Sequence, residues 1–129
     1  MHWSENYIGK PYSLGDADCA ALVCEVQEQE FDGTVPEFVL AMRENTRLKR
    51  VEQLESLARE AVTPTDNPDE GDVVLMLCKG RPSHVGVFCV VDGEPSVLHA
   101  MENAKMVVRH KIRDLEKFGL KVEGYYKWN

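Results

Sequence analysis

Residues 84–100 of the chain have the sequence HVGVFCVVDGEPSVLHA. β-Branched and other apolar residues dominate Val85–Val91 and Ser96–Ala100, which predicts two strands. Asp92-Gly93 between them is typical of a tight hairpin turn. The sequence therefore predicts an antiparallel hairpin whose two histidines, His84 and His99, lie close to each other across the ladder.

Further strands are predicted on both sides of this hairpin. The apolar runs that indicate them are Val73–Cys78, Met106–Lys111 and Val122–Trp128, with a short helix expected over Ile112–Phe118. Helical periodicity precedes them: one helix begins at Cys19 and is ended by Gly33, and further helix is expected between Pro36 and Val62 before a loop containing Pro64, Asn67 and Pro68. Helices followed by a meander of strands predict an α+β fold, with N-terminal helices packed on an antiparallel sheet of five to six strands.

The overall totals exclude several classes of protein. With 129 residues, the chain is expected to form one domain over 1–129. The formal net charge of −7 argues against a nucleic-acid partner, which would require a basic surface. No apolar run approaches the roughly 18–20 residues of a membrane span. The N-terminus lacks the features of a secretory signal, so the chain is expected to be cytoplasmic as synthesised.

The four cysteines show no CxxC pairing, so neither a metal site nor any other cofactor is indicated. We expect Cys24, Cys78 and Cys89 to be reduced and buried. Cys19 is different because it lies where a loop becomes a helix. Backbone N–H groups and the positive end of the helix dipole lower the pKa of a thiol placed there. The alternative for Cys19 is a structural cysteine in the first helical turn.

A thiolate nucleophile also needs a base, and the chain has four histidines. His2 is expected to be mobile at the terminus, and His110, among basic residues, to lie on a solvated surface. His84 begins an apolar strand, from which it can project into a cleft. His99 lies inside a strand, where a buried imidazole needs a polar partner. His99 can be either a hydrogen-bonded core residue or the group that orients His84.

Five short motifs, in order, resemble those of the NlpC-like cell-wall cysteine peptidases, which have a papain-like fold. They are Gly9-Lys10-Pro11-Tyr12-Ser13-Leu14-Gly15, Asp18-Cys19-Ala20-Ala21-Leu22-Val23, Gly71-Asp72-Val73-Val74, Ser83-His84-Val85-Gly86-Val87 and Leu98-His99-Ala100. Each motif alone is weakly specific, whereas the ordered set over positions 9–100 is specific.

The resemblance implies a catalytic triad of Cys19, His84 and His99 that hydrolyses amide bonds in peptidoglycan stem peptides. It also implies that Tyr12, Asp18 and Ser83 contribute to substrate binding. Tyr12 can equally be an aromatic residue that fills the loop, and Asp18 can act as the helix N-cap.

The motif around the nucleophile departs from the family pattern, because Ala20 and Ala21 replace the usual Ser-Gly. The serine hydroxyl that can help to recognise a free amine of the substrate is therefore absent. The charged segment 36–62 is expected to be a solvated face, with partner docking as the alternative.

A short domain without a signal also resembles tail-associated NlpC-like proteins of phages and prophages, which implies phage tail proteins as partners and a virion location. Two other functions stay open. One is a structural or assembly module of a tail that has the same fold and little activity. The other is a different papain-like activity, such as a transferase or an amidase acting on lipid or peptide conjugates.

Overall fold

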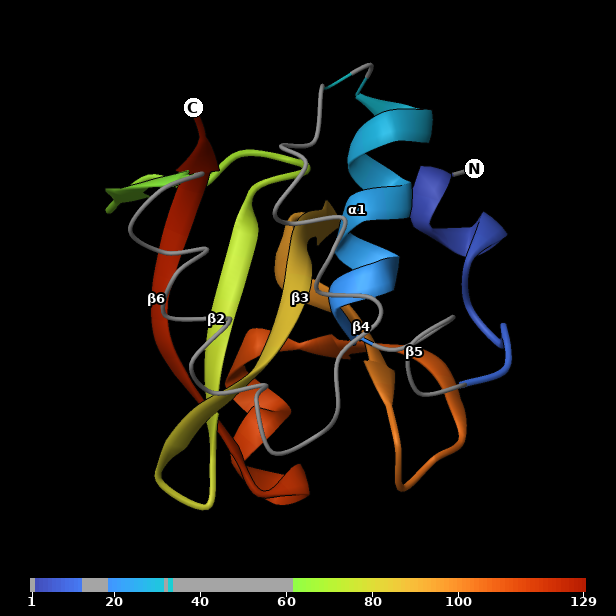
Figure 1. The fold of residues 1–129 in the computed structure, drawn as a ribbon, viewed down its shortest axis with the longest axis vertical. Coiled ribbons are helices and arrows are strands. Elements are labelled where there is room, and N and C mark those ends of the chain that lie inside the picture. Colours follow the sequence, from blue (N-terminus) through green and yellow to red (C-terminus); the bar gives the residue numbers. More distant parts are fainter. Residues whose placement is uncertain (1, 13–18, 32, 34–61) are drawn as a thin grey trace.

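A computed structural model of the chain describes residues 2–12, 19–31, 33 and 62–129 (Figure 1). Its elements in chain order are η1 (Trp3–Asn6), α1 (Cys19–Glu30), β1 (Val62–Thr65), β2 (Val73–Cys78), β3 (Arg81–Val91), β4 (Glu94–Met101), β5 (Met106–Lys111), η4 (Ile112–Phe118) and β6 (Leu120–Trp128). The expected helical segment from Pro36 to Ala61 lies outside the described residues, as does the N-cap position Asp18.

The six strands form one antiparallel sheet in the order β1-β6-β2-β3-β4-β5, so the predicted α+β class with an antiparallel sheet is confirmed. The hairpin is confirmed as well, since β3 pairs with β4 in a register that places Val87 opposite Leu98. Asp92 and Gly93 at its turn have φ values of 53° and 77°, as a type I′ turn requires. β3 begins at Arg81, four residues earlier than the sequence predicts.

Two features of the sheet differ from the prediction. β6 lies between β1 and β2, so the strands do not form a simple meander. Residues 62–65, expected to be the end of a helix and the start of a loop, form β1, in which Pro64 is paired with Tyr126 of β6. Proline is tolerated there because β1 is an edge strand, whose outward side needs no backbone donor.

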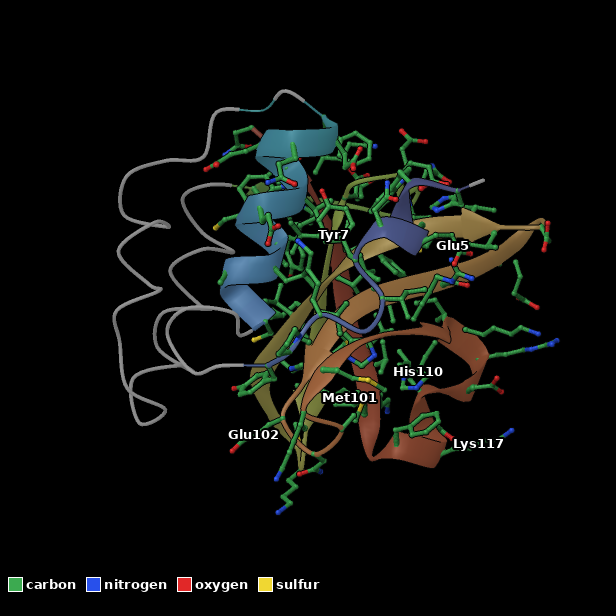
Figure 2. All side chains as sticks on the ribbon, turned by 90° about the vertical axis from the view of Figure 1, so that its right-hand side faces the viewer. Glu5, Tyr7, Met101, Glu102, His110 and Lys117 are labelled. Carbon is green, nitrogen blue, oxygen red and sulfur yellow. The ribbon has the colours of Figure 1, made fainter. Side chains whose placement is uncertain are left out.

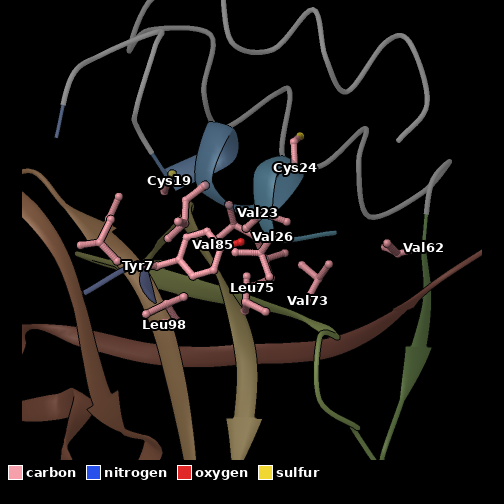
Figure 3. Packing of buried hydrophobic residues seen from close by; sticks show 14 residues of the cluster. Tyr7, Cys19, Val23, Cys24, Val26, Val62, Val73, Leu75, Val85 and Leu98 are labelled. Carbon is pink, nitrogen blue, oxygen red and sulfur yellow. The ribbon is translucent and has the colours of Figure 1, made fainter. Parts of the chain in front are cut away.

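The sheet separates two apolar cores, because successive residues of a strand face opposite sides. On one side α1 packs against the sheet, and a core forms around Val23, Val85 and Leu98 (Figure 3). On the other side lies η4, a 3-10 helix, whose Leu115 packs with Val97 in a smaller core. Figure 2 shows α1 and η4 on opposite sides of the strands.

The N-terminal segment is fixed to the sheet by hydrogen bonds at both of its ends. The carboxylate of Glu70 accepts hydrogen bonds from the Trp3 indole N–H at 3.1 Å and from the Val90 backbone N–H at 2.9 Å, and it also contacts the His2 ring at 2.9 Å. Further along, the backbone N–H of Tyr12 donates to the carbonyl of Lys105 at 2.9 Å. His2 is therefore held in place, and the expectation that it is mobile was wrong.

We expect Glu70→Ala to lower the free energy of unfolding by about 1–3 kcal/mol, because the charge-assisted hydrogen bonds of one carboxylate are lost together. Urea unfolding measures this change. Glu116→Ala, which removes an exposed carboxylate of η4, is the control and should leave the unfolding midpoint unchanged. Equal midpoints for Glu70→Ala and the wild type would show that the hydrogen bonds of Glu70 add nothing to stability.

Candidate active site

Two histidines from neighbouring strands are in direct contact. Nε2 of His84 on β3 lies 2.8 Å from Nδ1 of His99 on β4, and the two rings are nearly perpendicular at 80°. The predicted proximity of these side chains across the hairpin is thus confirmed. His84 is partly exposed, whereas His99 is fully buried.

Gly86 makes this contact possible. Residues 84 and 86 of β3 face the same side of the sheet. A Cβ atom added at Gly86 would lie 2.6 Å from Cγ2 of Val97, 2.8 Å from the carbonyl oxygen of Leu98 and 3.0 Å from Cβ of His99. Because position 86 carries no side chain, the ring of His84 can meet that of His99 diagonally across this space.

His99 is a neutral imidazole. Burial lowers the pKa of His99 well below its usual value, and the neighbouring rings of His84 and His110 lower it further. A neutral imidazole donates through one nitrogen and accepts through the other. Both ring nitrogens of His99 have a partner. Nδ1 contacts Nε2 of His84, and Nε2 lies 3.0 Å from Nδ1 of His110. The need of a buried imidazole for polar partners is therefore met by two other imidazoles.

His110 was expected on a solvated surface, and this expectation was wrong. It is partly buried on β5, and its ring stacks on Phe118 of η4 with a centroid distance of 3.9 Å and an interplanar angle of 9°. The basic neighbours of His110 in sequence misled the prediction, since alternate residues of a strand face opposite sides. Pairing of Met106–Lys111 with Ser96–Ala100 would have revealed the proximity, but the sequence does not fix that register.

Cys19 is the first residue of α1 (Figure 3), as the sequence predicts. Its exposed fraction is only 1%. The first backbone N–H groups of a helix have no partner within the helix, and they carry the positive end of its dipole. A thiol at this position lies in a setting that favours its negative form. The position suits either a nucleophile or a packed structural cysteine.

The other three cysteines are reduced thiols. Cys24 and Cys89 are buried, as expected, but Cys78 is partly exposed at the end of β2, so that part of the expectation was wrong. Burial raises the pKa of the Cys89 thiol to about 12, and the carboxylate of Glu70 adds to this effect. Cys89 is therefore an unreactive thiol at neutral pH.

The three expected substrate-binding residues are only partly described. Tyr12 is partly exposed, packs against the core beneath α1, and is held beside the start of β5 by its backbone hydrogen bond. Asp18 lies outside the described residues. Ser83 is part of β3, but its side chain lies outside what the structure describes.

Because side chains alternate along a strand, the three imidazoles lie on the same side of the sheet. His84, His99 and His110 face η4, whereas Cys19 belongs to the core on the α1 side. The β2–β3 register changes directly beside His84, because Met76 pairs with His84 but Cys78 pairs with Arg81. Such a bulge increases the local twist and redirects side chains. The ring of His84 thus lies where the strand departs from its regular course.

Within the described part of the chain, no group of three or more His, Cys, Asp or Glu side chains is arranged to hold a metal ion. None of the described helices is long and apolar enough for a membrane span.

Comparison with models of known protein families assigns the chain to one family. The model of the NlpC/P60 family matches residues 9–117. The chain belongs to the NlpC/P60 family. No match was found among curated proteins or among solved structures. NlpC/P60 proteins are generally hydrolases of the cysteine peptidase type that act on the cell wall, which indicates the same class for this chain. Family membership also favours a papain-like fold, although only one α-helix is described here. The match does not bear on the phage tail expectation, which stays a prediction.

We expect Gly86→Ala to lower the free energy of unfolding by about 1–3 kcal/mol, the range for overpacking a close-packed core. The backbone carbonyl of Leu98 is among the atoms that the new methyl group would meet, so the two strands must separate. Gly124→Ala on β6 is the matched control, since its Cβ would meet only the Tyr126 ring, at 3.3 Å. Urea unfolding of both variants measures the difference, and equal midpoints would contradict the close approach at Gly86.

Proposed function

We propose that the protein hydrolyses peptide bonds in peptidoglycan stem peptides with Cys19 as nucleophile, His84 as base and His99 as the residue that orients His84. The observation that carries this proposal is the 2.8 Å contact between Nε2 of His84 and Nδ1 of His99. A base held by a second polar group is the arrangement that activates serine and cysteine nucleophiles. Membership of the NlpC/P60 family supports the same reaction class.

The contact between the rings assigns a role to each nitrogen of His84. Nε2 faces His99, so Nδ1 is the nitrogen that would accept the proton from the Cys19 thiol. The resulting imidazolium would donate its Nε2–H to His99, which is neutral because it is buried. His99 would therefore stabilise the charged base as well as fix its orientation. This proposal requires Sγ of Cys19 to meet the His84 ring at the start of β3, where the bulge redirects the strand.

The reaction would follow the two steps of a thiol hydrolase. The Cys19 thiolate attacks the amide carbonyl carbon, and the negative charge that develops on the carbonyl oxygen is stabilised by backbone N–H groups at the start of α1. The His84 imidazolium donates its proton to the leaving amine, which leaves a thioester on Cys19. A water molecule that gives its proton to His84 then attacks the thioester and releases the acid.

We propose that Tyr12, Asp18 and Ser83 bind the stem peptide, as their motif positions imply. Tyr12 is supported by its partial exposure and by the backbone hydrogen bond that fixes it to Lys105. Since Ala20 and Ala21 replace the usual serine and glycine, recognition of a free substrate amine would depend on other groups.

Alkylation by iodoacetamide tests the nucleophile without any substrate. We expect Cys19 to react at a pH below 8.5, about the pKa of an ordinary thiol, because the helix start and the imidazole favour the thiolate. Mass spectrometry of digested protein measures the labelling of each cysteine. Cys89, whose pKa is raised to about 12, provides the internal control and should react last. Cys19→Ala should lose the fast phase and Cys78→Ala should keep it; a fast phase that survives in Cys19→Ala would assign it to another thiol.

Turnover of muropeptides tests the reaction itself. We expect Cys19→Ala and His84→Ala to reduce kcat/KM by at least a factor of about 1,000, since removal of one triad member removes the activated nucleophile. Lys111→Ala, an exposed change on β5, should turn over at the wild-type rate. Chromatography of the products also identifies the bond that is cleaved. Equal turnover by wild type and Cys19→Ala, or none by either, would instead favour a structural module, such as a component of a phage tail.

A further inference from the structure

A third imidazole continues the contact between His84 and His99. Nδ1 of His110 lies 3.0 Å from Nε2 of His99. The β4–β5 register places His99 opposite Val108 and His110 opposite Val97, so His99 and His110 are diagonal neighbours on one side of the sheet. Phe118 stacks on the ring of His110 and thereby fixes its plane. Figure 2 shows His110 beside the short helix that carries Phe118.

The three rings form a row with a direction. Both contacts join Nε2 of one ring to Nδ1 of the next, first from His84 to His99 and then from His99 to His110. Since a neutral imidazole has one donor and one acceptor nitrogen, the two hydrogen bonds of His99 must point the same way. In the forward arrangement each ring carries its proton on Nε2 and donates to the next ring. In the reverse arrangement each ring carries its proton on Nδ1.

Only the forward arrangement leaves His84 able to act as base. The His84 imidazolium has N–H donors at both nitrogens, so Nδ1 of His99 must be an acceptor. The proton of His99 must then reside on Nε2, which in turn requires an acceptor at Nδ1 of His110. A neutral His110 provides this acceptor. A protonated His110 carries N–H at both nitrogens and would make His99 donate toward His84.

We infer that His110 is a positioning residue of the site. Its neutral ring holds His99 in the tautomer that lets His84 accept the thiol proton. Protonation of His110 reverses the direction of both hydrogen bonds between the rings, so that His84 can no longer act as base. The inference rests on the proposed roles of Cys19, His84 and His99. It extends the site by one residue that does not touch substrate and acts through His99.

The surroundings of His110 favour its neutral form at neutral pH. His99 faces the ring from β4, and Asp114 approaches it from η4, where it is paired with Lys117 at 3.4 Å. Arg109, which precedes His110 on β5, donates hydrogen bonds to Ser4 and Glu5 of η1. Burial lowers the pKa of His110 below its usual value, and Asp114 acts in the opposite direction. His110 is therefore neutral at pH 7 and takes up a proton only at a pH below the usual pKa of a histidine.

Histidine ¹⁵N NMR of the whole chain tests the direction of the row directly. The ring nitrogen shifts of a neutral histidine distinguish Nε2–H from Nδ1–H, and single His→Gln variants assign the signals. We expect His99 to carry its proton on Nε2 at pH 7.5. In His110→Leu the fixed preference for this tautomer should be lost. A His99 proton on Nδ1 at pH 7.5, or an unchanged His99 signal in His110→Leu, overturns the inference.

The rate of Cys19 alkylation as a function of pH tests the functional consequence. As pH falls, the wild type should lose reactivity steeply, because both the thiolate and His110 take up a proton. His110→Gln offers an amide oxygen as acceptor but does not titrate. In this variant the fall of the alkylation rate on the acidic side should therefore occur at lower pH and be less steep. His110→Leu offers no acceptor and should react about 2- to 10-fold more slowly at pH 7.5, the effect of one neutral hydrogen bond.

Controls separate this inference from stability and from the proposed function. Lys111→Gln, an exposed neighbouring change, should leave the alkylation profile unchanged. Phe118→Leu keeps His110 but removes the stacked ring, and should slow alkylation less than His110→Leu. A profile of His110→Gln that coincides with that of the wild type overturns the inference. If Cys19 shows no fast alkylation but His99 has the forward tautomer, the positioning of the row by His110 stands and the proposed nucleophile fails.

Discussion

A buried neutral imidazole needs a donor and an acceptor, and this constraint organises the centre of the molecule. His99 has no exposure to solvent, so each nitrogen must find a partner inside the protein. The partners are His84 on one neighbouring strand and His110 on the other. The registers of β3, β4 and β5 are therefore coupled to the polar interactions of one side chain. A shift of one residue in either pair would move a histidine to the opposite face and leave His99 with an unpaired nitrogen.

The two faces of the sheet carry different groups of side chains. The α1 side is a continuous apolar core, which holds the first turn of the helix and Cys19 in a fixed place. The η4 side is smaller, and the row of imidazoles runs beside it, with the stacked ring of Phe118 at its end. The bulge in the pairing of β2 with β3 lies directly beside His84. Under the proposed function, the nucleophile and its base come from opposite sides of the sheet and meet at the start of β3.

Much of the fold is predictable because it depends on local chemistry. Asp92-Gly93 specifies a type I′ turn, and this turn fixes the hairpin and the proximity of His84 and His99. The start of α1 at Cys19 follows from apolar periodicity after a glycine- and proline-rich lead. β1 was missed because Pro64 suggests a loop, and only pairing of this segment with β6 makes it a strand. The NlpC/P60 family match extends the resemblance of five motifs to residues 9–117.

By itself, the sequence determined the α+β class and the central hairpin, since turn residues and periodicity act over short distances. The candidate nucleophile and base came from the resemblance of its ordered motifs to those of a known family. Tertiary structure alone decided the insertion of β6 between β1 and β2, the close approach at Gly86 and the partner of Nε2 of His99. These features depend on register between strands, which no local pattern encodes. His110 shows the difference most clearly: its neighbours in sequence are charged and suggest solvent, whereas its neighbours in space are a buried histidine and an aromatic ring.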